Sequence, residues 1–117
     1  MEFQVCDYGL YKVVMLLEGM GKAELGELDA IIKGQIQAGA QYLILDFSTV
    51  QTINSAAIGS IILGNSILKA RGGRLIMVGC NELIKGVFKL IGYLEKFTIA
   101  NTLPEGIEMA QNAILRT

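Results

Sequence analysis

The sequence predicts a single α/β domain over residues 1–117, with a mostly parallel sheet of about five strands and four crossover or flanking helices. Two observations support this prediction. Short apolar runs typical of strands alternate with longer segments whose apolar residues recur at helical spacing, in the order β-β-α-β-α-β-α-β-α. The chain is also 52% hydrophobic and only 7% aromatic, so it has enough aliphatic side chains to form the core of one domain.

The N-terminal part of the chain is expected to form a hairpin and then a helix. Residues 3–7 and 11–17 have strand-like patterns, and the short break containing Gly9 favours an antiparallel pairing of the two. The second run becomes continuously apolar, which is typical of an interior strand. The segment 22–38 follows, and Gly39 is a natural stop for a helix there. Its apolar face consists of Leu25, Leu28, Ile31, Ile32 and Ile36.

The rest of the chain continues the alternation of strands and helices. Predicted strands cover residues 42–47, 75–78 and 97–99. Predicted helices run from Ser55 to about Lys69, from a cap at Asn81 to Gly92, and from near Pro104 onward. We expect the last two helices to bury Leu83, Ile84, Val87, Phe88 and Ile91, and Ile107, Ala110, Ile114 and Leu115, respectively.

Charge and hydropathy exclude several classes of function. The formal net charge is −1, from 10 basic and 11 acidic residues, so no basic surplus predicts binding of nucleic acid. The apolar runs end well before the roughly 20 residues that span a bilayer, so no membrane insertion is expected. The start of the chain does not resemble a signal peptide. We therefore expect a cytoplasmic protein.

The residue types needed for catalysis or metal binding are scarce. The chain has no histidine, which removes the usual zinc sites and the serine and cysteine triads. Cys6 and Cys80 are far apart in the sequence and are expected to be reduced packing residues. Asp46, at the end of a strand, is expected to hold the following loop rather than to act as a ligand or base. The sequence thus predicts a non-enzymatic protein without a metal or cofactor.

A hydroxyl group lies where a predicted strand has ended and a predicted helix begins. Residues 42–47 form the strand, a polar connection follows, and the helical pattern starts directly after Asn54 and Ser55. Helix N-termini present free N–H groups and the positive end of the macrodipole. Ser55 is therefore well placed for either of two roles, to cap the helix or to carry a phosphate.

The helix that begins at Ser55 carries apolar residues on more than one side. Its expected core-facing residues are Ile58, Ile61, Ile62 and Leu68. A second stripe of small or apolar residues consists of Ala56, Ser60, Leu63, Gly64 and Ile67. Such a helix either packs against further parts of the same domain or binds another molecule. The sequence leaves both interpretations open.

The order of these elements resembles the STAS domain and, more narrowly, the bacterial anti-sigma factor antagonists. The resemblance rests on four segments in the same order and spacing, and it covers nearly the whole chain. They are Leu45-Asp46-Phe47-Ser48, Ile53-Asn-Ser-Ala-Ala-Ile-Gly59, Lys69-Ala-Arg-Gly-Gly-Arg-Leu75, and Leu90-Ile-Gly-Tyr-Leu94 with Phe97. Each segment is a weak signal alone, but their combination is specific.

The resemblance implies a role for the turn around Ser55. In that family the turn usually has the form Asp-Ser-[Ser/Thr/Ala]-Gly-[Leu/Ile]-Gly, and its first serine is phosphorylated by a partner that is both kinase and anti-sigma factor. Ser55 matches this serine, and Ile58 and Gly59 match the last two positions. Asn54 replaces the usual aspartate, and Ala57 replaces the usual first glycine.

The function implied is that of an anti-sigma factor antagonist. Such a protein binds an anti-sigma factor serine kinase while Ser55 is unphosphorylated, which releases a sigma factor, and a phosphatase is a further candidate partner. The residues predicted to bind the partner are Asn54, Ser55, Ala56, Ile58, Gly59, Ser60, Leu63 and Ile67.

Two alternative functions stay open at this point. The first is a STAS interaction module of another signalling or transport complex, in which Ser55 is never phosphorylated. The second is a small-ligand or nucleotide-binding domain that uses the turn at residues 48–59. Neither a Gly-Lys-Ser/Thr loop nor another nucleotide-binding motif supports the second alternative.

Overall fold

The computed structural model describes residues 3–17, 25–93 and 97–116. In this part of the chain, five strands form one sheet in the order β1-β2-β3-β4-β5. The antiparallel hairpin consists of β1 (Phe3–Asp7) and β2 (Tyr11–Leu16). From β2 onward the neighbours are parallel, through β3 (Tyr42–Asp46), β4 (Arg74–Val78) and β5 (Thr98–Ala100). The predicted hairpin and the interior position of its second strand are confirmed.

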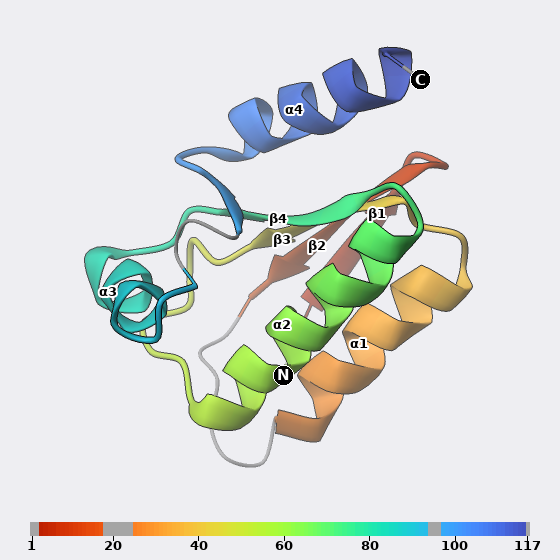
Figure 1. The fold of residues 1–117 in the computed structure, drawn as a ribbon. Helices are drawn as coiled ribbons and strands as arrows, with labels where there is room; N and C mark the ends of the chain where they lie inside the picture. The colour runs from red at the N-terminus through yellow and green to blue at the C-terminus, as the bar shows by residue number, and fades with distance from the viewer. Residues whose placement is uncertain (1–2, 18–24, 94–96, 117) are drawn as a thin grey trace.

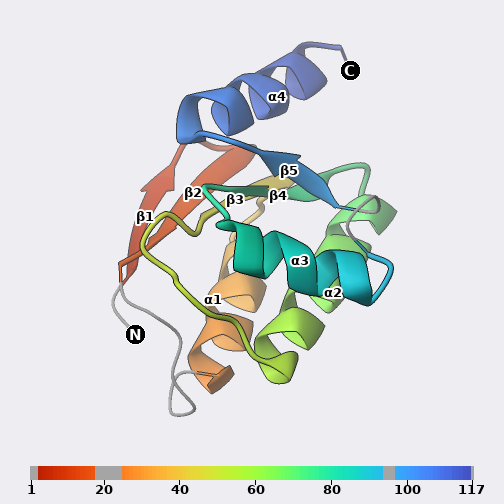
Figure 2. The ribbon, with the colours of Figure 1, turned by 90° about the vertical axis from the view of Figure 1, so that its left-hand side faces the viewer.

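Helices cover both faces of the sheet (Figure 1). On one face lie α1 (Leu25–Gln37) and α2 (Ser55–Ala70), side by side. The short α3 (Glu82–Leu90) lies in front of α2 in the view of Figure 2, and its buried residues belong to the same apolar cluster as the buried apolar side chains of α2. On the opposite face lies α4 (Leu103–Leu115), which crosses the sheet without a neighbouring helix among the described residues. The predicted class, a mostly parallel sheet with flanking helices, is confirmed.

The sheet separates two apolar clusters. On the side of α1, α2 and α3, the largest fully buried side chains include Leu43, Leu45 and Phe47. On the side of α4, the cluster is smaller and is centred on Ile44, Ile76 and Val78. Both faces of β3 are therefore covered, which explains why its sequence is a continuous apolar run instead of an alternating one.

A close approach between helices fixes the position of α2. A Cβ atom added to Gly64 would lie 2.6 Å from Cγ2 of Ile32 on α1, so the absence of a side chain there allows the two helices to pack closely. On the adjacent side of α2, the buried Asn65 accepts a hydrogen bond through Oδ1 from the backbone N–H of Leu75, at 3.0 Å. These contacts attach α2 to both α1 and β4.

Three predicted core residues are instead exposed. Leu83 is 58% exposed, Ile91 43% and Leu115 82%. The helix α3 has only nine residues and buries Ile84 and Phe88, which are four positions apart, so its contact with the core is a narrow strip. Leu83 points away from that strip, Ile91 follows the end of α3, and Leu115 lies in the last turn of α4.

The predicted ends of the first helix are only partly described. Its proposed start at residue 22 lies outside the described residues, and the described portion ends at Gln37. Gly39 follows with a φ of 98°, a conformation that glycine adopts more readily than other residues. The expected stop at Gly39 is confirmed.

Candidate functional site

The connection that leads to Ser55 is anchored at its start by Asp46. The carboxylate oxygen Oδ1 of Asp46 accepts hydrogen bonds from the Ser48 backbone N–H, at 2.9 Å, and from the Ser48 hydroxyl. The Thr49 hydroxyl donates to the carbonyl oxygen of Leu16 at 2.5 Å, and Val50 is buried. Asp46 therefore has the structural role that the sequence predicted for it.

The second half of the same connection is attached to the start of α3. The Asn81 side chain donates through Nδ2 to the carbonyl oxygen of Gln51 at 2.9 Å. Its Oδ1 accepts from the Ile84 backbone N–H at 2.8 Å, so the same residue caps α3 as predicted. One asparagine thus couples the start of α3 to the segment that precedes Ser55.

The N-cap of α2 is Asn54, and Ser55 is the first residue of the helix. Asn54 has an extended backbone, and its Oδ1 accepts from the Ala57 N–H at 3.0 Å. Ser55 is exposed, and the described residues provide no hydrogen-bond partner for its hydroxyl group. The interpretation of Ser55 as a cap is therefore wrong, because Asn54 occupies the cap position and accepts the hydrogen bond from the Ala57 N–H.

The electrostatic environment at this end of α2 favours an anion. The helix contains no acidic residue in its first turn, whereas α3 and α4 carry Glu82 and Glu105 in theirs. The free N–H groups and the positive end of the α2 macrodipole are thus not offset by a carboxylate in that turn. A phosphate on Ser55 would lie in a favourable field.

A line of exposed small and apolar residues extends from Ser55 along α2. We call it the α2 face, and it consists of Ser55, Ala56, Gly59, Leu63 and Ser66. Leu63 is 47% exposed, which is high for a large apolar side chain. A Cβ atom added to Gly59 would have no described heavy atom within 4 Å, so the surface there is bare backbone. Ser66 was not predicted, although its spacing of three residues from Leu63 could have indicated it.

The other predicted binding residues are less accessible. Ser60 is half-buried, and its hydroxyl donates to the carbonyl oxygen of Ala56 at 3.1 Å. Ile58 and Ile67 are also half-buried and pack against the main core. Gly64 is buried against α1. Of the two interpretations of the second stripe, packing within the domain therefore holds at Gly64, because α1 packs against that side of the helix.

The remaining chemistry of the described residues is limited. Both cysteines are free, with Cys6 half-buried and Cys80 buried. Burial raises the pKa of the Cys80 thiol to about 11, so it remains protonated and a poor nucleophile near neutral pH. No group of three His, Cys, Asp or Glu side chains is placed to hold a metal ion among the described residues. In the same part of the chain, no helix is long and apolar enough to cross a membrane.

Known proteins resemble this chain in sequence and in fold. The family model described as the STAS domain matches residues 23–106. BtrV of Bordetella bronchiseptica, a candidate anti-sigma factor antagonist, is 25% identical over 91 residues, which cover 77% of this chain and 78% of BtrV.

Two solved structures have the same fold at lower sequence identity. The Bacillus cell fate determinant SpoIIAA in its phosphorylated form is 21% identical, with a TM-score of 0.73 over 92% of this chain and 98% of that one. An anti-sigma factor antagonist from Mycobacterium paratuberculosis is 16% identical, with a TM-score of 0.83 over 94% of this chain and 93% of that one.

Proposed function

The chain belongs to the STAS domain family, and on this basis we propose that it is an anti-sigma factor antagonist controlled by phosphorylation of Ser55. In its unphosphorylated state it binds an anti-sigma factor that is also a serine kinase, and a sigma factor is released. The protein acts as a binding module in this proposal and is a substrate of the kinase, not a catalyst.

The observation that carries the proposal is the state of the Ser55 hydroxyl. It is exposed at the first position of a helix whose cap is already supplied by Asn54, so modification would break none of the described hydrogen bonds. Phosphorylation adds about −1.5 to −2 charges at neutral pH. The N-terminus of α2 favours that charge, so the fold should survive modification with little change.

The same charge would interfere with binding at the α2 face. This surface is small and apolar near Ser55, with Ala56 exposed on one side and Gly59 one turn further along the helix. A partner that packs closely there would have to desolvate a bulky dianion. Binding is then switched by the charge itself, without refolding of the domain.

Two comparisons support this proposal. BtrV is a candidate anti-sigma factor antagonist, and it aligns over most of both chains. SpoIIAA, which has the same fold, has been solved in a phosphorylated form, so a protein of this architecture tolerates the modification.

The second candidate function is a STAS module of another complex in which Ser55 stays unmodified. The residues beside Ser55 favour it, because Asn54 stands where the family pattern has a carboxylate and uses its Oδ1 as the helix cap. Ala57, in place of the first glycine, is fully buried. Mass spectrometry of the protein from its native cells distinguishes the candidates: phosphate on Ser55 supports the first, and its absence under all growth conditions supports the second.

The direct test compares Ser55→Ala and Ser55→Asp in calorimetric titrations with the anti-sigma kinase encoded nearest to this protein. Ser55→Ala should bind like the wild type. Ser55→Asp should bind at least about tenfold more weakly, because desolvating a carboxylate costs more than the roughly 1.4 kcal/mol that corresponds to a factor of ten.

A charge-matched control separates this effect from a change in net charge. Gln4 is exposed on β1, so Gln4→Glu adds one negative charge away from the α2 face and should leave the dissociation constant unchanged. Equal affinities for the two Ser55 variants would refute the proposed switch.

A further inference from the structure

A cavity of about 410 Å³ lies between α4 and the sheet, away from the α2 face. Tyr42, Arg74 and Thr98, three of the residues that line it, are the first residues of β3, β4 and β5. Because these strands are parallel, the cavity lies at the edge of the sheet where they begin. Ser55 follows the opposite edge, where they end.

The packing of α4 explains why the cavity forms at this edge. A Cβ atom added to Gly106 would lie 2.5 Å from Cγ1 of Val78, so the first half of α4 approaches the sheet closely. Ala110, one turn later, is fully buried. The cavity is lined by residues from the middle of α4 to its end, which are Met109, Asn112, Ala113 and Arg116.

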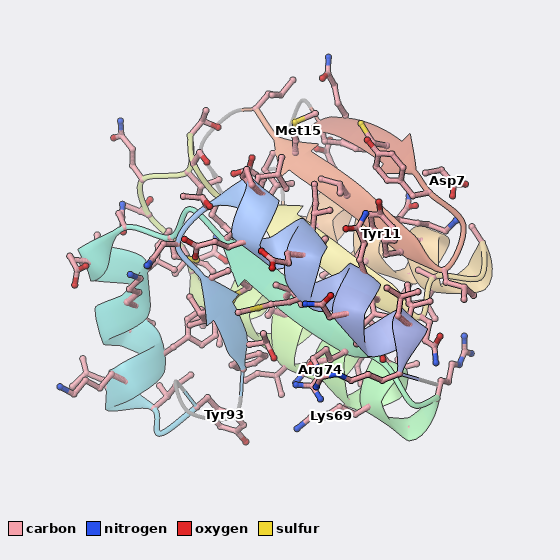
Figure 3. The ribbon with its side chains drawn as sticks, turned by 90° about the horizontal axis from the view of Figure 1, so that it is seen from above. Asp7, Tyr11, Met15, Lys69, Arg74 and Tyr93 are labelled. Carbon is pink, nitrogen blue, oxygen red and sulfur yellow. The ribbon has the colours of Figure 1, made fainter. Side chains whose placement is uncertain are left out.

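Two guanidinium groups give the cavity its charge. Arg74 extends from the start of β4 on one side of α4 (Figure 3), and Arg116 follows the last turn of that helix. No carboxylate is among the described residues that line the cavity, and neither arginine forms an ion pair within the described part of the chain. Arg74 donates to the Thr98 hydroxyl at 3.3 Å, which leaves most of its N–H donors available.

The rest of the lining supplies apolar surface and neutral polar groups. Ile76, which is 1% exposed, Met109 and Ala113 provide the apolar part. Strand register places Arg74 next to Tyr42, whose hydroxyl donates to the carbonyl oxygen of Gly72 at 3.3 Å. A concave apolar surface with a few convergent polar groups is the usual form of a small-molecule site, and 410 Å³ is within the usual size range of such sites.

We propose that this cavity binds a small organic anion, with its carboxylate or phosphate group at Arg74 and Arg116 and its apolar body against Ile76 and Met109. Guanidinium groups match both anions through paired N–H donors. The site is separate from the α2 face, so a ligand there would leave Ser55 accessible. The proposal therefore goes beyond the proposed function and does not depend on it.

Heteronuclear NMR titrations of the whole chain test this proposal with three probes of one shape: naphthalene carboxylate, naphthyl phosphate and the neutral naphthalene carboxamide. Either anion, or both, should shift the backbone amide signals of Ile76, Thr98 and Ala113. The anion that binds more tightly identifies the preferred anionic group. The neutral carboxamide should bind at least tenfold more weakly, because it lacks the charge-assisted hydrogen bonds.

Variants assign the binding to the two arginines. Arg74→Gln and Arg116→Gln should each weaken binding of the preferred anion about tenfold or more. Lys89→Gln removes the same charge from an exposed position on α3 and should have no effect. The proposal is overturned if neither anion shifts these signals, if the carboxamide binds as tightly as the anions, or if both arginine variants bind like the wild type.

Discussion

Replacing Gly59 by alanine should make the protein more stable and its partner binding weaker. Gly59 lies inside α2, where glycine is about 0.8 to 1 kcal/mol less favourable than alanine. The added Cβ would meet no described heavy atom within 4 Å, so no clash offsets this gain. For a domain of this size the gain corresponds to a rise of about 3 to 6 °C in the melting temperature.

The same methyl group should obstruct a partner that packs against the α2 face. Inserting a methyl into a close-packed contact costs about 1 to 3 kcal/mol, which corresponds to a roughly 5- to 150-fold weaker affinity. Gly34→Ala is the matched control, because Gly34 is also exposed inside a helix and an added Cβ there would likewise meet no described atom within 4 Å.

Differential scanning calorimetry and titration with the anti-sigma kinase measure the two effects separately. Both variants should have a higher melting temperature, and only Gly59→Ala should lose affinity. If Gly59→Ala binds like Gly34→Ala, close packing at this point of the α2 face is refuted. If it lowers the melting temperature, Gly59 is not an open position and the stability argument fails.

Two further predictions concern the exposure of α2 and the ion pair of the hairpin. Leu63→Glu should leave the melting temperature nearly unchanged and weaken partner binding, because Leu63 is exposed. Ile67→Glu should lower the melting temperature, because Ile67 packs against the core. Equal melting temperatures for the two variants would contradict the assignment of Leu63 to the surface and Ile67 to the core. The Lys12 side chain is 3% exposed, and its Nζ donates to Oδ1 of Asp7 at 2.7 Å. This hydrogen bond is the largest cause that lowers the pKa of Asp7 below 3.8, and the hydrogen bond from the Gly9 backbone N–H is the next largest. A lowered pKa gives stability that is present above pH 3.8 and is lost as the pH falls through the folded-state pKa. The Asp7→Asn variant should therefore be less stable than the wild type in urea at pH 7 and should approach it in acid. Equal stability at pH 7 would show that the ion pair contributes nothing.

Much of the fold follows from local patterns in the sequence. The continuous apolar run of β3, the glycine-containing break between β1 and β2, and the alternation of strands and helices are properties of neighbouring residues. The loop role of Asp46 and the cap at Asn81 could be predicted for the same reason, since each acts within three residues of its own position. The resemblance to STAS domains added the match between Ser55 and the serine that is phosphorylated in that family.

Helical periodicity identified apolar faces but not what covers each of them. Leu83 lies next to a buried strip yet is exposed, because α3 is short and contacts the core only through Ile84 and Phe88. Gly64 belonged to a stripe whose cover the sequence left open, and it is buried because Ile32 of a separate helix packs there. Burial of this kind depends on which helix lies opposite, and that partner is distant in sequence.

The hydrogen bonds at the start of α2 and the cavity beside α4 also required the tertiary structure. Asn54 and Ser55 are both good capping residues, and only the backbone conformation of Asn54 decided between them. Arg74 and Arg116 come from a strand and from the end of a helix, so their spacing in the chain carries no signal of a common cavity. The sequence by itself determined where strands and helices form, because those patterns are local. The packing of α4 over the sheet determined that Arg74 and Arg116 line one cavity, because that contact joins distant parts of the chain.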